Sequence, residues 1–304
     1  MAGLLDIDKS KETWDLKWSN HMKLRLFTLS IITIALVLIS SCSDYNDKPA
    51  EDFGYSDIGS ITAVYDQSLA EIDSGGKVMI LYLDGFSWKQ FQTAAEYGDA
   101  AFMNEHFQQS PALSVTKPVT NAGMAAMITG TPPEINGISD RSKRIFKGTD
   151  IFEKVTGQGK SAMLIEGNSQ VLNTSIEPVL NIDRNGNGTD DEVAESALMA
   201  LKKDPDLIMV HFHGIDDQGH EAGPYGETTM AKIREIDGYI GQLTESFKGL
   251  IVLTADHGMH ETDSGGDHGE NVEEDMVVPF LIWNQNKSQG EALLWRITVA
   301  KIPN

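Results

Sequence analysis

Five side chains of the types that bind transition metals stand in the second half of the chain. Asp256 and His257 come directly after an apolar run, and Asp216 and His220 follow another such run, four residues apart. That spacing places both side chains on one face of a helical turn, where they can share one metal. His268 lies further on in a glycine-rich loop. Residue types and spacing together predict a metal centre built from imidazoles and carboxylates.

The first half of the chain supplies two further candidates. Asp84 ends an apolar run and precedes a glycine, which permits close approach of a metal; the alternative is a cap for the next helix. Thr120 stands where the N-cap of a small-residue helix ending at Gly130 is expected. Its hydroxyl would face free backbone N–H groups, either as a simple cap or as a nucleophile stabilised at the positive end of the helix. The alternative nucleophiles are Thr116, Ser114 and Thr129.

Three more residues lie close to these candidates in the sequence. Arg141 follows a turn and is placed to meet an anion. His211 and His213 share one face of a predicted strand, where they either donate hydrogen bonds behind the metal ligands or serve as structural histidines.

The candidate residues stand at the ends of predicted strands or at the start of a predicted helix. The apolar runs have the character of buried parallel strands, and helical segments alternate with them. This pattern predicts an α/β fold: a doubly wound, mostly parallel central sheet with helices on both faces. Such sheets bind ligands at the carboxyl ends of their strands. The predicted strands span residues 77–83, 161–165, 206–213, 249–253 and 277–283, and the helices include 192–203 and 227–247.

Composition narrows the chemistry further. The chain has 304 residues, 40% of them hydrophobic, which is enough for one large domain. The net charge of −21 excludes a role on a nucleic-acid duplex, because an anionic surface repels the phosphate backbone. With one cysteine in the chain, neither an internal disulfide nor a zinc–thiolate cluster can form. Any transition metal must therefore be bound by histidine and aspartate.

The N-terminal residues indicate a targeting signal followed by a tether. Residues 1–21 are polar and suggest an upstream extension before the true start. Residues 22–41 combine a basic start, a short apolar stretch and small residues before Cys42, the pattern of a lipoprotein signal with an acylated cysteine; a plain signal peptide or a buried helix is the alternative. Residues 43–75 are acidic and predict a tether with a short helix around 63–72. We expect a globular domain over 76–304, exported and lipid-anchored on the periplasmic or cell-surface side.

An acidic segment in the middle of the chain matches half of a calcium-binding loop. Oxygen ligands alternate around a central glycine, but position twelve is Ala194 instead of glutamate. A solvated acidic turn that caps the following helix is the alternative. The candidate calcium ligands are Asp183, Asn185, Asn187 and Asp191.

The order of these motifs resembles the alkaline phosphatase superfamily. It is most similar to the type I phosphodiesterase/nucleotide pyrophosphatase branch and to the related GPI ethanolamine-phosphate transferases. The resemblance covers residues 77–283 and implies two zinc ions, with Thr120 as both ligand and nucleophile. It implies one zinc on Asp84, Thr120, Asp256 and His257, and another on Asp216, His220 and His268.

Two features depart from the pattern of the branch. Residues 121–124 replace a Phe-Pro-Asn-His stretch, and Arg141 stands in place of a phosphate-binding asparagine. We expect Asn121 and Arg141 to bind substrate, and an arginine can bind a doubly charged monoester through two parallel hydrogen bonds. The helix and strand pattern that normally follows the run 277–283 is absent, so we expect a truncated chain with an incomplete C-terminal sheet edge.

The resemblance implies a metal-dependent hydrolase of small phosphate esters, a phosphodiesterase or phosphatase with a phosphothreonine intermediate. Two alternatives stay open: a phosphoethanolamine-type phosphotransferase, and a surface lipoprotein that holds metal without turnover. A sulfatase would need a Cys/Ser-x-Pro-Ser-Arg stretch, which the sequence lacks.

Overall fold

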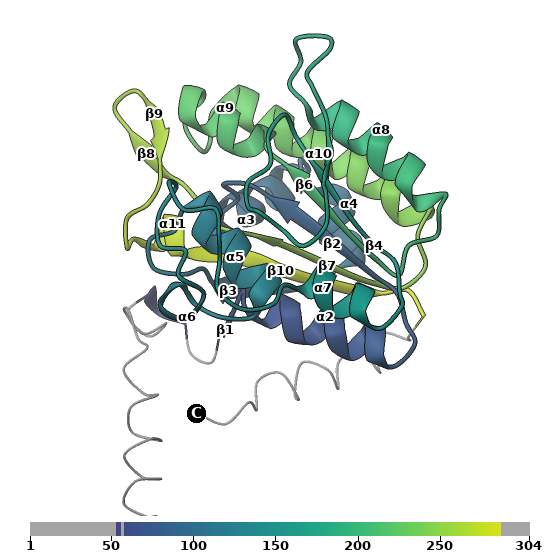
Figure 1. Cartoon of the computed structure of the whole chain (residues 1–304). Helices are drawn as coiled ribbons and strands as arrows, with labels where there is room; N and C mark the ends of the chain where they lie inside the picture. Colours follow the sequence, from purple (N-terminus) through teal and green to yellow (C-terminus); the bar gives the residue numbers. More distant parts are fainter. Residues whose placement is uncertain (1–52, 56–57, 287–304) are drawn as a thin grey trace, which may run out of the picture. The chain divides into compact units, whose positions relative to one another are not determined.

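The computed structural model describes residues 53–55 and 58–286 (Figure 1). Within these residues, eight strands form the main sheet in the order β1-β3-β10-β7-β2-β6-β4-β5, and two more form a hairpin. The sheet strands are β1 (Gly59–Ser60), β2 (Val78–Leu83), β3 (Gln108–Leu113), β4 (Ala162–Glu166), β5 (Val179–Leu180), β6 (Leu207–Phe212), β7 (Leu250–Ala255) and β10 (Val277–Asn284). The hairpin strands are β8 (His260–Thr262) and β9 (Gly265–Asp267).

The sheet is mostly parallel. β2 runs parallel to both β6 and β7, β4 runs parallel to β5 and β6, and β1 runs parallel to β3. Only β10 is antiparallel to its neighbours in the described sheet. Every residue of β2, β6 and β7 is buried, as expected for strands covered on both faces. The predicted fold class is confirmed.

The helices form two groups that cover the two faces of the sheet (Figure 1). One group packs around α5, which carries Thr120, and the other packs around the long α10. The first group is α2 (Ala63–Asp73), α5 (Thr120–Thr129), α6 (Pro133–Asn136) and α7 (Ile151–Gly157). The second is α3 (Trp88–Tyr97), α4 (Ala101–His106), α8 (Asp190–Leu201), α9 (Gly214–Ala222) and α10 (Glu227–Glu245), and the short α11 (Glu273–Met276) precedes β10.

The folded domain begins before residue 76. The helix expected around 63–72 is present as α2, but it packs on the sheet instead of lying in a tether. Ile61, Val64 and Ile72 are fully buried in the core, and β1 pairs with β3. Few apolar residues occur in this segment, yet those few face the interior, so composition alone misplaces the boundary. The expected extension, signal and Cys42 lie outside the described residues.

Strand β10, predicted over residues 277–283, lies inside the described sheet. It pairs with β3 on one side and β7 on the other, so residues 277–284 lie in the sheet interior. β3 was not predicted, because its sequence Gln-Gln-Ser-Pro-Ala-Leu is polar and contains a proline.

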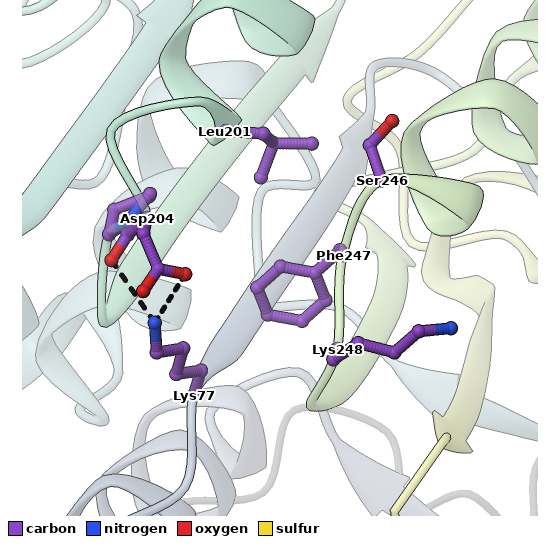
Figure 2. Close-up of a pocket in the computed structure, with 7 residues that line it drawn as sticks. Lys77, Leu201, Asp204, Ser246, Phe247 and Lys248 are labelled. Atoms are coloured by element: carbon purple, nitrogen blue, oxygen red, sulfur yellow. Dashed lines mark hydrogen bonds and ion pairs between the residues drawn. The ribbon is translucent and has the colours of Figure 1, made fainter.

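A small pocket lies at the opposite end of the sheet from the candidate site (Figure 2). It is lined by segments that precede β2, β6 and β7, and Lys77 forms an ion pair with Asp204 there. None of the candidate metal ligands lines it. Among the described residues, no helix has the length and apolar character needed to cross a bilayer.

Candidate metal centre

The predicted ligands meet at the carboxyl ends of three adjacent strands. Asp84 directly follows β2, Asp256 and His257 directly follow β7, and α9 with Asp216 and His220 follows β6. Because β7, β2 and β6 are neighbours and parallel, their carboxyl ends lie side by side.

The first group consists of Asp84, Asp256 and His257. His257 Nε2 lies 3.3 Å from Asp84 Oδ1 and 3.2 Å from Asp256 Oδ2. Thr120 Oγ1 lies 3.5 Å from Asp84 Oδ1 and 3.4 Å from His257 Nε2. The structure therefore brings together all four residues that the resemblance assigns to one zinc.

Thr120 is not the helix cap that the sequence predicts. Val119 takes the N-cap position, and Thr120 is the first residue of α5. Its hydroxyl faces Asp84 and His257 instead of capping the helix, so it is available as a nucleophile or a metal ligand. Two of the alternative nucleophiles are engaged elsewhere: Ser114 donates to the Asp256 carbonyl and Thr129 to the Ala125 carbonyl.

The second group consists of Asp216, His220 and His268. His220 Nε2 lies 3.4 Å from Asp216 Oδ2, and His268 Nε2 lies 3.5 Å from Asp216 Oδ1. The four-residue spacing of Asp216 and His220 on α9 brings their side chains together, as predicted. His268 comes from the loop after β9 and completes the group.

Each of the three predicted histidine ligands is held through Nδ1. His257, His220 and His268 direct Nδ1 to the carbonyl oxygens of Gly258, Gly266 and Pro118, at 2.9, 3.0 and 3.0 Å. A hydrogen bond of this kind fixes the proton on Nδ1 and leaves Nε2 free as a ligand. In all three residues Nε2 faces the carboxylates.

The ligand separations fit a metal better than they fit direct hydrogen bonds. Two ligand atoms on one tetrahedral zinc lie about 3.2–3.6 Å apart, given metal–ligand distances of about 2.0–2.2 Å. The six separations given above fall between 3.2 and 3.5 Å. Asp216 Oδ1 and Asp256 Oδ2 are buried and have no hydrogen-bond partner. The residues present therefore fit a divalent cation in each group.

Charge is unbalanced in the metal-free cluster. Burial and the neighbouring Asp84 carboxylate raise the pKa of Asp256 to about 7. Burial would also raise the pKa of Asp84, but hydrogen bonds from His211, His213 and His257 hold it well below its usual value. The pKa of His257 rises to about 10, because the buried carboxylates Asp256 and Asp84 outweigh the effect of burial. A bound cation would take over the role of these protons.

The second group shows opposite shifts on its two histidines. The hydrogen bond with Asp216 raises the pKa of His220 to about 9. Burial and the nearby His257 lower the pKa of His268 to about 4. His268 is therefore neutral at physiological pH, which is the form that binds metal.

Two glycines allow the elements to approach this closely. Gly85 has a φ of +70°, and a Cβ there would lie 2.8 Å from Asp216 Oδ1. A Cβ at Gly123 in α5 would lie 2.5 Å from the Asp256 Cβ. Side chains at these positions would push α9 away from β2, or α5 away from β7.

The two predicted substrate-binding residues differ in their surroundings. Arg141 extends from an exposed loop and its Nη2 contacts His268 Nε2, so it lies at the second group. Asn121 is buried, and its Nδ2 donates to the carbonyls of Lys143 at 2.8 Å and Val171 at 3.3 Å. Asn121 thus ties the loop that carries Arg141 to the start of α5, next to Thr120.

Sequence reasoning offered His211 and His213 as hydrogen-bond donors behind the metal ligands, and it missed Glu166. His211 and His213 form a third group with Asp84, and the buried Glu166 lies behind His211. The two histidines had been seen on one strand face, but only the pairing of β6 with β2 shows that they face Asp84. Glu166, at the end of β4, gave no sequence signal of its own.

The predicted calcium ligands form hydrogen bonds within a turn. Asp183 Oδ1 accepts from the backbone of Asn185 and Gly186, and Asn185 Oδ1 accepts from the Asn187 backbone. Asn185 Nδ2 donates to Asp191. Among the described residues, neither Asp183 nor Asp191 belongs to a metal-binding group of three His, Cys, Asp or Glu side chains. The arrangement favours the alternative of a solvated acidic turn ahead of α8.

Residues 168–279 match the family described as Type I phosphodiesterase / nucleotide pyrophosphatase. This range contains the ligands Asp216, His220, Asp256, His257 and His268, whereas Asp84 and Thr120 lie before it.

Similar curated proteins are GPI ethanolamine phosphate transferases. Transferase 1 of Chaetomium globosum is 30% identical over 99 residues, which cover 30% of this chain and 10% of the relative. Transferase 2 of Kluyveromyces lactis is 36% identical over 96 residues, covering 30% and 12%. The catalytic subunit of human transferase 2 is 30% identical over 103 residues, covering 31% and 10%. The matched part thus spans about a tenth of the length of these relatives.

Solved structures share the fold. A murine ectonucleotide pyrophosphatase/phosphodiesterase 5, solved as an inactive variant with AMP, gives a TM-score of 0.53 at 16% identity, covering 69% of this chain and 88% of that one. Phosphonoacetate hydrolase from Sinorhizobium meliloti, with phosphonoformate, gives 0.50 at 17% identity, covering 62% and 59%. In the matched family segment, in the transferase relatives and in the fold, the chain is similar to the type I phosphodiesterase branch of the alkaline phosphatase superfamily.

Proposed function

We propose that this protein is a two-metal hydrolase of small phosphate esters that acts through a phosphothreonine intermediate. The observation that carries the proposal is the position of the Thr120 hydroxyl, 3.5 Å from Asp84 and 3.4 Å from His257 at the first ligand group. The family match and the fold support the same chemistry.

Two divalent cations, zinc by the choice of imidazole and carboxylate ligands, would lower the pKa of the Thr120 hydroxyl and polarise the phosphoryl oxygens. Asp84, Thr120, Asp256 and His257 would hold one, and Asp216, His220 and His268 the other. The chain's residues fix where the phosphoryl group sits between these two groups.

In the proposed reaction, the Thr120 oxygen attacks phosphorus and the bond from phosphorus to the leaving oxygen breaks. The leaving oxygen takes up a proton, and the phosphoryl group stays on Thr120. Water then attacks phosphorus, and the Thr120 oxygen leaves, so that two inversions give net retention. Because Thr120 opens α5, the positive end of the helix dipole stabilises both the alkoxide and the phosphoryl adduct. Arg141 would donate to the phosphoryl oxygens from the side of His268.

A phosphotransferase is the second candidate, and the transferase relatives support it. The first half of the reaction would be the same, and an alcohol acceptor would replace water in the second half. A metal-holding protein without turnover would keep the ligand groups but lack a productive Thr120.

The test is paired hydrolysis of p-nitrophenyl phosphate and bis-p-nitrophenyl phosphate by the zinc-loaded protein, with Thr120→Ala beside it. A preference for the monoester supports Arg141 as a clamp on the dianion, and a preference for the diester favours phosphodiesterase activity. Zinc-dependent hydrolysis that survives Thr120→Ala unchanged would reject the proposed intermediate. A folded, metal-bound protein that hydrolyses neither ester points to the transferase or to the inactive binding protein.

We also propose that the protein is exported and anchored through a lipid on Cys42. Metabolic labelling with an alkyne fatty acid should mark the wild-type chain and leave Cys42→Ala unlabelled. Equal labelling of both chains would contradict the anchor.

A further inference from the structure

We propose that Asp190 is a positioning residue of the second ligand group, because its carboxylate fixes the start of α9, the helix that carries Asp216 and His220. The inference rests on the two-metal hydrolase proposed above. Asp190 is the first residue of α8 and is buried. Among the described residues, it belongs to none of the groups of side chains that could hold a metal. Its influence on the site therefore has to pass through α9.

The Asp190 carboxylate meets the first backbone N–H groups of α9. Oδ1 accepts from the backbone N–H of His213 at 3.1 Å and from that of Gly214 at 3.3 Å. His213 is the N-cap residue of α9, but its own side chain makes no cap hydrogen bond. The N–H groups at a helix start have no partner within the helix, and a carboxylate there satisfies them and complements the helix dipole. Asp190 thus supplies the cap that His213 does not.

A buried lysine holds the Asp190 carboxylate in place. Lys232 Nζ, from α10, lies 3.4 Å from Asp190 Oδ2 and 2.9 Å from Glu235 Oε2. It also donates to the Asn187 carbonyl at 3.3 Å, in the turn that precedes α8. Burial would lower the pKa of Lys232, but Glu235 and Asp190 outweigh it and raise the pKa above its usual value. Lys232 is therefore charged and neutralises the buried carboxylate.

Gly214 allows this carboxylate to approach the backbone of α9. A Cβ at Gly214 would overlap Asp190 Oδ2 and would lie 2.7 Å from Lys232 Cδ. Glycine is a weaker helix former than alanine. At the first position of α9, contact with Asp190 thus takes the place of helix propensity.

The second ligand group depends on the position of α9. The side chains of Asp216 and His220 are 16% and 35% exposed, whereas those of Asp256 and His257 in the first group are fully buried. Packing therefore holds the second group less firmly than the first. Asp216 also lies in the first turn of α9, directly after the residues that Asp190 caps. Fraying of this turn would move Asp216 away from His220 and His268.

The experiment measures the zinc affinity of one group at a time. Asp256→Asn disables the first group and leaves the second, and His268→Gln does the reverse. The full-length protein in each background is stripped of metal and titrated with ZnCl₂ against a chromophoric chelator. Adding Asp190→Ala should weaken zinc binding by roughly 2–30-fold in the Asp256→Asn background, the range that loss of a helix cap covers. The affinity in the His268→Gln background should stay close to its starting value.

Asp237→Ala is the matched control. Asp237 is also a buried carboxylate on one helix, α10, that accepts from two backbone N–H groups at the start of another helix, α4. Its partners are Phe102 at 2.8 Å and Met103 at 2.9 Å. α4 carries no residue of either ligand group. Asp237→Ala should lower the free energy of urea unfolding as Asp190→Ala does, but leave zinc affinity unchanged in both backgrounds.

Two further variants separate position from stability. Asp190→Asn keeps an acceptor oxygen for the N–H groups of His213 and Gly214, and should restore most of the affinity. Gly214→Ala should weaken zinc binding in the Asp256→Asn background, because the methyl group displaces the carboxylate, although alanine favours the helix. This variant replaces Asp190→Ala if that variant does not fold.

The outcomes distinguish this inference from the proposed hydrolase. Equal zinc affinity of the second group with and without Asp190→Ala would overturn the positioning role and leave the hydrolase standing. An equal fall in both backgrounds, or in Asp237→Ala, would also overturn it, because the effect would then come from a general loss of stability. No zinc binding in the Asp256→Asn background would overturn both. A selective fall in a protein that hydrolyses neither ester would support the positioning role and reject the hydrolase.

Discussion

The imidazole of His268 lies flat on that of His257, with ring centroids 3.6 Å apart and planes 14° apart. His257 belongs to the first ligand group and His268 to the second, so the stacked rings place the two groups side by side. The loop after β9 reaches over the end of β7 to make this contact. A phosphoryl group placed between the groups would therefore meet both from one side, with Thr120 next to His257 and Arg141 next to His268.

Replacing Thr120 with alanine should lower kcat by roughly a thousandfold or more, because the covalent step loses its nucleophile. Zinc content should stay close to that of the wild type, since Asp84, Asp256 and His257 remain. Thr120→Ser should retain measurable activity. Thr116→Ala is the control, because the sequence offers Thr116 as an alternative nucleophile. Initial rates with both p-nitrophenyl esters check this, and greater loss in Thr116→Ala would move the nucleophile there.

Gly123→Ala should destabilise the protein by about 1–3 kcal/mol, the usual cost of overpacking, because the new methyl group would lie 2.5 Å from the Asp256 Cβ. Its zinc affinity should fall as well, since Asp256 is displaced. Gly238→Ala in α10 is the matched control, because a Cβ there has no atom within 4 Å. The control should gain about 0.5–1 kcal/mol from helix propensity. Urea unfolding of both variants and of the wild type, with and without zinc, tests this prediction. Equal free energies of unfolding for Gly123→Ala and the wild type would show that α5 can shift to accommodate the methyl group.

Asn121→Ala should raise KM by roughly 2–10-fold, the effect of one or two lost hydrogen bonds. The reason is positional, because Asn121 holds the backbone of Lys143 and Val171 and thereby the loop that carries Arg141. Asn121→Asp keeps the size of the side chain but loses the donor, and should behave in the same way. If Asn121→Asp matches the wild type in steady-state kinetics, the hydrogen bonds of Asn121 have no influence on substrate binding.

Arg141→Gln should lower kcat/KM for the monoester by about 10–100-fold, because a charge-assisted hydrogen bond to the dianion is lost. The diester, with one negative charge, should lose less. Arg144→Gln is the control from the same loop, since Arg144 donates to the Gln170 carbonyl instead of contacting His268. Equal losses on both substrates would indicate that Arg141 only shapes the loop.

Zinc binding should strengthen as pH rises from 6 to 9. In the metal-free protein the pKa of His257 is about 10 and that of His220 about 9, so both carry a proton at neutral pH. Zinc binds only neutral imidazole, and each displaced proton costs roughly tenfold in affinity per pH unit below its pKa. Isothermal titration in buffers of different ionisation enthalpy should show proton release at pH 7. An affinity independent of pH would contradict these shifts.

The sequence was sufficient to predict the site because its residues follow strongly apolar runs. β2, β6 and β7 are wholly buried, so their apolar character is continuous and their ends are clear. The i, i+4 pair of Asp216 and His220 also needed only local geometry. The meeting of Asp84, Asp216, His220, Asp256 and His257 followed from one rule, that adjacent parallel strands end at the same edge. Thr120 and His268 joined this set only through the resemblance.

Other features depended on contacts that no local pattern encodes. Thr120 is the first helical residue, because Val119 takes the N-cap position with an extended backbone. Helix propensity does not locate a helix end to within one residue. Asn121 donates to Lys143 and Val171, 22 and 50 residues away in the chain. The pairing of His211 with Asp84 and Glu166 required the order of strands β2, β6 and β4.

β10 is made last among the described strands, yet it stands between β3 and β7. A chain growing on the ribosome therefore carries two open edges, on β3 and on β7, until Asn284 has emerged. Thr120 follows β3, whereas Asp256 and His257 follow β7, and within the described sheet these strands are joined only through β10. The order of synthesis thus keeps the sheet that carries Thr120, Asp256 and His257 unfinished until β10 has been translated.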